Sequence, residues 1–392
     1  MENLWNDKEA SAYKSDLEQR VYSSNLLGQS DELVLHGGGN TSVKSEVDGE
    51  DILYVKGSGW DLVSIKAEGF APVKLSTLLE MAKLETLSDM DMVTGQKRAM
   101  IDNSAPNPSV EAILHAIIPF KVVDHTHADA VVTISNSVNG KEHIERLYPN
   151  FLIVPYIMPG FILAHEIYKM TLNLDWDSCD GIILLNHGIF TFDNDAKKSY
   201  DKMIEAVSLA ENFLHENAEI SFDKIEPTGF DMQEFKHKIK DIKEHKVVLK
   251  LNQTQLALNY ASNPYLEEFA TRGVLTPEHI LRTKHQPLIV DNNNLDERLE
   301  EFVEGYKEYF DAFATSDMIM LNPAPNYAVV QGFGVISIGK NEKEVNIIND
   351  IVEHTMLAVI KADKLGGYES ISLEDSFAME YWELEQAKLR KK

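Results

Sequence analysis

The sequence predicts a mixed α/β protein with two domains. Its 392 residues exceed the usual size of one domain, and 44% of them are hydrophobic, which is enough for a sizeable core in each domain. Short stretches rich in Val, Ile and Thr alternate with longer amphipathic stretches, the patterns of strands and helices respectively. We therefore expect one domain over residues 1–220 and a second over residues 221–392.

Charge and cysteine content exclude several classes of protein. The formal net charge of −26 argues against sequence-independent binding of nucleic acid and against an anionic membrane surface. The single cysteine, Cys179, excludes an internal disulfide and a cysteine-based zinc site. No stretch is apolar for long enough to span a bilayer, and the charged N-terminus has no apolar core of a secretory signal. We expect a cytoplasmic protein with no nucleic acid or membrane partner.

Helix and strand signals alternate through the first 135 residues. We expect helices at residues 8–27, 75–100 and 110–118, and strands at residues 33–35, 41–43, 52–55 and 121–135. The glycine clusters GGGN (37–40) and GSG (57–59) separate the early strands as turns. Glycines beside Asn, Thr and Ser can also present backbone N–H groups to an anion such as phosphate. The local sequence leaves both interpretations open.

The remaining chain continues the same alternation. We expect strands at residues 151–157 and 181–185, a helix at 193–216, helices at 232–258 and 295–313, and a strand pair near 328–338. His279, Arg282 and Lys284 lie close together near Thr276 and Pro277. We favour a helix start there, with Thr276 as its N-cap and Pro277 in its first turn. A segment that closes over substrate is the alternative.

Three histidines form a candidate metal site. His125 and His127 are two residues apart in a predicted strand, so both imidazoles point to the same side. A third ligand should follow another strand, and His187 does so, beside Gly188, which permits a tight turn. An isolated histidine is more often a hydrogen-bonded residue than a ligand, but this spacing favours a metal. Three neutral imidazoles leave a fourth position open, as in catalytic zinc sites.

A carboxylate lies close to these histidines in the sequence. Glu111 precedes His115 by four residues, a spacing that places both on one face of a short helix ending before Pro119. The metal does not need Glu111 as a ligand, so its carboxylate is available for proton transfer. A solvated helix residue, or a partner for Lys121, is the alternative interpretation.

Five motifs in this order resemble the class II aldolase/adducin family of metal-dependent sugar-phosphate aldolases and epimerases. They are GGGNTS (37–42), KGSGWDL (56–62), PSVEAILH (108–115), VDHTHAD (123–129) and NHGIF (186–190). The resemblance implies an α/β/α layered N-terminal domain around a mainly antiparallel sheet. It implies zinc on His125, His127 and His187, with Mn²⁺, Co²⁺ or Ni²⁺ as other metals for these ligands, and Glu111 as the catalytic acid/base. It also implies that substrate phosphate is bound at Gly39, Asn40, Thr41, Ser58, Gly59 and Ser109.

The second half also carries a resemblance. The segments TRGVLTPEHILRTKHQPLIV (271–290), VVQGFGVISIGKNEKE (329–344) and MEYWELEQAKLR (379–390) look like the C-terminal part of the aldolase half of bifunctional rhamnulose-1-phosphate aldolase/lactaldehyde dehydrogenases. One position departs from the related fuculose-phosphate aldolases, which commonly have two serines before the catalytic glutamate. Here Val110 takes the second place, so one hydroxyl donor for substrate phosphate is missing.

We therefore expect a metal-dependent aldolase that splits a ketose 1-phosphate, such as rhamnulose 1-phosphate, into dihydroxyacetone phosphate and an aldehyde. Cleavage beside a ketone leaves an enediolate, which a chelated metal stabilises and a nearby carboxylate protonates. A sugar-phosphate 4-epimerase or a dehydratase is one alternative, because the same metal would stabilise a similar anion. A non-catalytic interaction module of the adducin kind is another, although it would not need metal ligands.

We expect neither NAD nor a dehydrogenase step in this chain. A dinucleotide site needs a strand and then G-x-G-x-x-G opening a helix. The GGGN cluster leads into a predicted strand, and Gly332 and Gly334 are followed by the β-branched run at residues 335–338. The chain ends shortly after the third resembling segment, which leaves no room for a further domain of ordinary size. We also expect a homo-oligomer.

Overall fold

The computed structural model describes residues 1–384 and 386, so the last part of the MEYWELEQAKLR segment lies outside the described residues. The chain forms two compact units. The N-terminal unit contains Met1–Ser135 and Asn139–Phe213, and the C-terminal unit contains Asn136–Val138 and Leu214–Gln386. The expected domain boundary at residue 220 stays a proposal.

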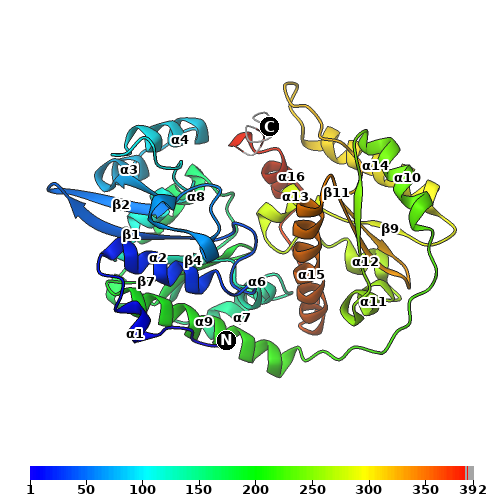
Figure 1. The fold of residues 1–392 in the computed structure, drawn as a ribbon, viewed down its shortest axis with the longest axis horizontal. Helices are drawn as coiled ribbons and strands as arrows, with labels where there is room; N and C mark the ends of the chain where they lie inside the picture. The colour runs from blue at the N-terminus through cyan, green and yellow to red at the C-terminus, as the bar shows by residue number, and fades with distance from the viewer. Residues whose placement is uncertain (385, 387–392) are drawn as a thin grey trace. The chain divides into compact units, whose positions relative to one another are not determined.

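The N-terminal unit is built on one seven-stranded sheet in the order β3-β2-β1-β4-β7-β6-β5 (Figure 1). Its strands are β1 (Asn40–Val47), β2 (Glu50–Lys56), β3 (Phe70–Lys74), β4 (Val122–Thr126), β5 (Phe151–Val154), β6 (Gly181–Leu184) and β7 (Gly188–Asp193). Neighbouring strands are antiparallel except β5 and β6, which are parallel. The mainly antiparallel sheet is thus confirmed.

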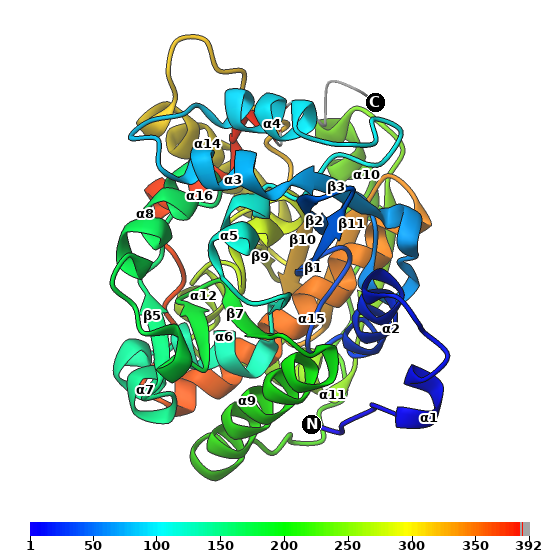
Figure 2. The ribbon, with the colours of Figure 1, turned by 90° about the vertical axis from the view of Figure 1, so that its left-hand side faces the viewer.

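Helices lie on both faces of this sheet, as the turned view in Figure 2 shows. They are α1 (Asp7–Ala10), α2 (Asp16–Leu27), α3 (Leu75–Ala82), α4 (Asp89–Arg98), α5 (Ala112–Ile117), α6 (Asp129–Ser135), α7 (Gly140–Leu147), α8 (Phe161–Thr171) and α9 (Ala196–Asn217). Strand alternation assigns the faces. Val123 packs in a core with residues of α5 and α8, whereas its neighbour Val122 packs with Val43 and with Ala196 of α9. The expected α/β/α layering is confirmed.

Two predicted helices of the N-terminal unit are each divided in two. The stretch 8–27 becomes α1 and α2, because a capping box starts a new helix at Ser15. The Ser15 hydroxyl accepts from the Glu18 N–H at 3.2 Å, and the Glu18 carboxylate accepts from the Ser15 N–H at 2.9 Å. The stretch 75–100 becomes α3 and α4, and the hydroxyl of Ser88 caps α4. The starts of α2 and α4 are therefore set by serine caps and not by the spacing of hydrophobic residues.

Strand predictions were correct for the cores of β1, β2, β5 and β6 and wrong at two places. Residues 33–35 form no strand: Leu33 ends a turn, and the next two residues have no regular secondary structure. The long strand expected at 121–135 ends at Thr126, and the β-branched run after Asp129 is the buried helix α6. Here tertiary packing overrides the strand preference of Val, Ile and Thr. Strands β3 and β7 were not predicted.

The C-terminal unit has its own four-stranded sheet, in the order β8-β11-β10-β9. The strands are β8 (Val248–Asn252), β9 (Leu288–Val290), β10 (Tyr327–Val330) and β11 (Gly334–Gly339). The helices are α10 (Met232–Lys243), α11 (Gln255–Ala261), α12 (Leu266–Ala270), α13 (Ile280–Thr283), α14 (Leu295–Phe313), α15 (Glu342–Lys364) and α16 (Leu373–Glu380). Only β9 and β10 run parallel. The expected mixed α/β second domain is confirmed.

Several individual predictions for this unit can be checked. The helix 295–313 is α14, and the strand pair near 328–338 is the antiparallel hairpin of β10 and β11. The helix expected at 232–258 is instead α10, β8 and α11 in succession. Thr276 and Pro277 do open a short 3-10 turn, although the Thr276 hydroxyl donates to Glu278 and makes no cap. Among the described helices, none has the length and apolar character to cross a membrane.

Candidate metal centre

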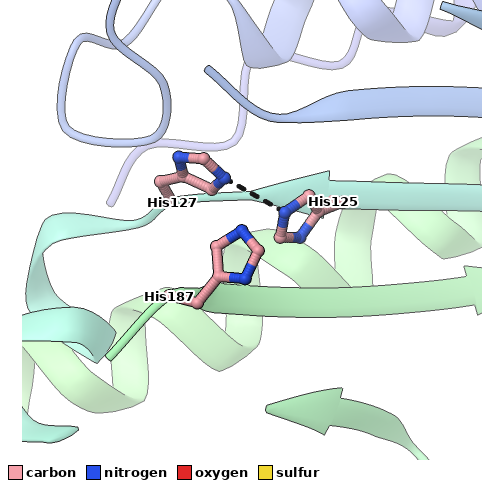
Figure 3. A group of neighbouring side chains, drawn as sticks. All are labelled: His125, His127 and His187. Atoms are coloured by element: carbon pink, nitrogen blue, oxygen red, sulfur yellow. Dashed lines mark hydrogen bonds between the residues drawn. The ribbon is translucent and has the colours of Figure 1, made fainter. Parts of the chain in front are cut away.

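The three predicted histidine ligands come together in the N-terminal unit (Figure 3). His125 lies on β4, His127 just beyond the end of β4, and His187 in the turn between β6 and β7. One nitrogen from each ring lies within 4.8 Å of the other two. The Nε2 atoms of His125 and His127 are 3.1 Å apart. This spacing allows all three imidazoles to bind one ion.

Strand register and glycine explain why these rings meet. Strand β4 pairs with β7, with His125 opposite Phe190 and Thr126 opposite Ile189. This register places the turn before β7, which contains His187, beside the end of β4. A Cβ atom on Gly188 would lie 2.4 Å from the carbonyl oxygen of Thr126, so only glycine permits this approach. The glycine in NHG therefore serves the packing of the turn against β4.

The protonation of His125 suits a ligand. Its Nδ1 lies 3.1 Å from the carbonyl oxygen of Ile189, which can only accept, so Nδ1 carries the hydrogen and Nε2, on the side of His127, carries the lone pair. Burial, together with the neighbouring His127 and His187, lowers the pKa of His125 well below its ordinary value. The ring is neutral at physiological pH, as a metal ligand must be. A backbone partner that fixes the tautomer is typical of metal-binding histidines.

Glu111 stands beside the histidines and is buried, with 7% of its surface exposed. Its Oε2 lies 3.6 Å from Nε2 of His125, and its Oε1 lies 3.8 Å from Nε2 of His187. Oε2 accepts a hydrogen bond from Asn40 at 2.5 Å, whereas Oε1 has no hydrogen-bond partner among the described residues. A buried carboxylate oxygen without a partner is costly. A divalent cation held by the imidazoles would lie close to this oxygen and offset the cost.

The donor set therefore fits a metal. Three neutral nitrogens with a nearby carboxylate suit Zn²⁺ and related first-row ions. The alternative interpretations of Glu111 are wrong, because the residue is not solvated and Lys121 pairs with Asp16 at 2.7 Å. Glu111 is also the residue before α5, not a residue within its helical turn as the four-residue spacing suggested.

The predicted phosphate-binding residues divide between two places. Ser58 and Gly59 form an exposed turn that meets the segment containing Ser109, since the Ser58 N–H donates to Asn107 and the Ser109 N–H donates to Lys56. The other three predicted residues, Gly39, Asn40 and Thr41, lie where the glycine loop enters β1.

Within that second group the side chains point in different directions. Asn40 pairs with His125 across the sheet and its amide binds Glu111. Thr41 has the opposite orientation, and its hydroxyl is 2.8 Å from that of Ser24 on α2. A Cβ atom on Gly39 would lie 2.6 Å from the carbonyl oxygen of His125, which ties the loop closely to β4.

The motifs did not reveal the hydrogen-bond partners of the site. Asn40 and Ser42 are two residues apart on a strand, and Glu111 and His115 are four apart at the start of a helix. Each pair therefore presents two polar groups in the same direction, and in the structure the two pairs bind one another. This matched spacing was the available signal.

The α/β/α fold and the histidine group define a class of metal-binding enzyme domain. The chain belongs to the class II aldolase/adducin family. Residues 19–214 match the model of the "Class II Aldolase and Adducin N-terminal domain", and residues 231–389 match that of "Aldolase class II, second domain". Class II aldolases are metal-dependent lyases, and the three histidines of this chain could bind such a metal.

Known proteins similar to this chain include both a solved domain and a longer protein. The N-terminal class II aldolase domain of a conserved protein from Thermoplasma acidophilum is 40% identical, with a TM-score of 0.50, over 55% of this chain and 99% of that one. The "Uncharacterized oxidoreductase YuxG" of Bacillus subtilis (strain 168) is 28% identical over 99% of this chain but only 60% of its own length. The L-fuculose-1-phosphate aldolase from Thermus Thermophilus is a more distant likeness, 14% identical with a TM-score of 0.34, over 50% of this chain and 95% of that one.

Proposed function

We propose that the chain is a metal-dependent sugar-phosphate aldolase in which His125, His127 and His187 hold the metal and Glu111 transfers the proton. The observation that carries this proposal is the Glu111 carboxylate, buried beside the imidazoles with one oxygen that accepts no hydrogen bond from any described residue. A purely structural carboxylate in such a position would be expected to have both oxygens satisfied. Family membership supports an aldolase-type activity on a sugar phosphate.

The proposed substrate is a ketose 1-phosphate resembling rhamnulose 1-phosphate, and the products are dihydroxyacetone phosphate and an aldehyde. When bound, a divalent cation, in our proposal zinc, would supply Lewis-acid polarisation of the substrate carbonyl. Cleavage removes a proton from the hydroxyl group at the breaking bond and adds one to the carbon that stays with the phosphate. We assign the second transfer to Glu111, the buried carboxylate beside the imidazoles.

Phosphate recognition is proposed at the two glycine turns, Gly39 with Asn40 and Thr41, and Ser58 with Gly59 and Ser109. The Lys56 ammonium donates to the Gly37 carbonyl oxygen at 2.9 Å and so connects the two turns. Backbone N–H groups are the donors that we propose where a side chain is already engaged, as in Thr41.

No dinucleotide chemistry forms part of the proposal. The Gly37–39 loop leads into β1, and Gly332 and Gly334 lie at the hairpin between β10 and β11, so neither cluster opens a helix. YuxG is named an oxidoreductase, but this chain spans only 60% of it. A cytoplasmic location and a homo-oligomeric state complete the proposal.

The test is incubation of the zinc-loaded protein with a panel of ketose 1-phosphates and ketose 5-phosphates, with products identified by NMR. We expect an aldehyde and dihydroxyacetone phosphate from at least one ketose 1-phosphate. Glu111→Gln should keep the metal and lower turnover by roughly 10²–10⁴-fold, the usual range for general acid–base catalysis. The matched control is Glu142→Gln, at an exposed residue of α7, which should leave turnover unchanged.

Other outcomes would redirect the assignment. A product epimeric at carbon 4, or a dehydrated sugar, would indicate the epimerase or dehydratase alternative. A protein that takes up no metal would indicate an interaction module of the adducin kind. Release of metal by Glu111→Gln would mean that the carboxylate is itself a ligand.

A further inference from the structure

A row of buried polar side chains connects β1 to the candidate acid/base. The Asn40 amide nitrogen contacts Oε2 of Glu111 at 2.5 Å, and its oxygen makes a close hydrogen bond with Nε2 of His115. On the far side of the ring, Nδ1 of His115 lies 2.7 Å from the hydroxyl of Ser42. His115 and Ser42 have no exposed surface, and Asn40 is 6% exposed.

The Glu111 carboxylate, at one end of this row, sets the direction of every hydrogen bond in it. A carboxylate only accepts, so Asn40 must turn its NH2 group toward Glu111 and its carbonyl oxygen toward His115. That oxygen also only accepts, so Nε2 of His115 carries a hydrogen. A neutral imidazole has one N–H, which leaves Nδ1 as the acceptor and the Ser42 hydroxyl as its donor.

The ring of His115 is neutral over the working pH range. Burial lowers the pKa of His115 to about 3, and the cations Lys44 and Arg20 act in the same direction. His115 is also separate from the metal ligands, because its ring faces Asn40 and Ser42 with both nitrogens. Its edge packs on Phe190, with ring centroids 5.6 Å apart. Neither metal binding nor charge explains a histidine at this place.

We propose that His115 is a positioning residue: its Nε2–H, on a ring supported by Ser42, holds the carbonyl oxygen of Asn40 and so keeps the Asn40 NH2 group on Glu111, which holds the carboxylate in place for proton transfer. This inference rests on the proposed function. The two orientations of an amide have almost the same shape, so packing alone selects neither. If the amide turned over, its carbonyl oxygen would face a carboxylate oxygen at 2.5 Å, and repulsion would displace Glu111. The Ser42 hydroxyl can donate or accept, so it supports the ring in either tautomer; the Glu111 carboxylate selects the orientation, and the Nε2–H of His115 then holds the Asn40 oxygen in it.

The row does not serve as a proton pathway in this proposal. Its outer end, Ser42, is fully buried, and an amide does not pass protons readily. Its effect is geometric: Oε2 of Glu111 is bound to Asn40, and Oε1, without a hydrogen-bond partner in the described part of the chain, stays available for the substrate. A displacement of about 1 Å at a reacting group can lower a rate by about 10²-fold.

The test compares three variants of the intact, zinc-loaded chain with ketose 1-phosphate as substrate. His115→Phe removes both hydrogen bonds and should lower kcat by about 10- to 100-fold, with KM and zinc content within twofold of the wild type. His115→Gln keeps a donor for Asn40 and should recover most of this loss. Ser42→Ala is a small change that should still fold, and it should lower kcat by a few-fold. The matched control is His165→Phe, at a partly buried histidine of α8 whose Nδ1 contacts a backbone carbonyl, and it should leave kcat unchanged.

A second measurement does not depend on activity. ¹⁵N NMR of the labelled protein should show His115 as the Nε2–H tautomer, and Ser42→Ala should retain it, because the Asn40 oxygen selects that tautomer. An Nδ1–H tautomer in the wild type would overturn the proposal, even if no aldolase activity were found. Equal losses in His115→Phe and His115→Gln, or loss of zinc together with activity, would also overturn it by indicating a structural role. An inactive wild type with the Nε2–H tautomer would instead count against the proposed function.

Discussion

Replacing Asp124 with asparagine should destabilise the N-terminal unit strongly. Asp124 precedes His125 on β4 and points to the opposite face of the sheet, where its Oδ1 lies 2.5 Å from Nη2 of Arg20 on α2. Neither side chain has any exposed surface. Ser199 of α9 donates to the other carboxylate oxygen at 2.5 Å. The pair therefore connects the strand that carries His125 to both helices behind it.

The magnitude follows from burial. Removing one partner of a buried ion pair leaves an uncompensated charge and costs about 3–5 kcal/mol. Within residues 1–384 and 386, the other hydrogen bonds of the Arg20 guanidinium are longer, to Ser24 at 3.2 Å and to the Val123 carbonyl at 3.5 Å. The matched control is Asp201→Asn, which removes an ion pair with Lys197 at 2.8 Å on the surface of α9. Exposed pairs of this spacing contribute about 0.3–0.5 kcal/mol.

The assay is urea unfolding at pH 7 in excess chelator, so that metal binding does not differ between variants. Both changes lie in the N-terminal unit, and the same transition therefore reports both. We expect Asp124→Asn to lower the free energy of unfolding by several times more than Asp201→Asn. The double variant Arg20→Met, Asp124→Leu should regain most of that loss. Equal small losses for the two Asp→Asn variants would refute the argument that β4 depends on this pair.

Three further predictions concern other buried groups. His125→Ala should reduce copurifying zinc from about one ion per chain to a small fraction, as measured by mass spectrometry of the metal; full occupancy would contradict the site. Because His115 has a pKa of about 3 when folded and 6.5 when exposed, the unfolded chain alone gains a proton as pH falls below 6.5. The free energy of unfolding should therefore fall by about 2 kcal/mol between pH 6.5 and pH 5 because of His115. Urea titrations of His115→Gln at the two pH values should not show this contribution. Lys284→Met should destabilise the C-terminal unit by about 3 kcal/mol, because it leaves the buried Glu380 without its cation. Adding Glu380→Gln should restore most of the thermal stability. If it restores none, the lysine acts through packing.

The histidine group of the candidate site could be predicted because its three members follow local rules. His125 and His127 alternate along an extended segment, and His187 follows a strand and precedes a glycine, so short windows of sequence were sufficient to select them. The α/β/α fold was implied by the family resemblance that the five motifs carry. The helix boundaries did not, because Ser15 and Ser88 start new helices inside stretches whose hydrophobic pattern is continuous. The chain contains other serines, and the hydrophobic pattern does not mark these two as helix caps.

The functions of the motif around Asn40 could not be separated from sequence alone, because consecutive residues of a strand serve opposite faces. The segment GGGNTS resembles a single phosphate loop, yet Asn40 and Ser42 face the histidines while Thr41 faces α2. Period-two alternation predicts that division once the strand is known to begin at Asn40. It does not predict that the Asn40 amide is used by Glu111, since that contact joins residues 71 positions apart. Such contacts depend on how α5 packs over β1, and only the tertiary structure provides that placement.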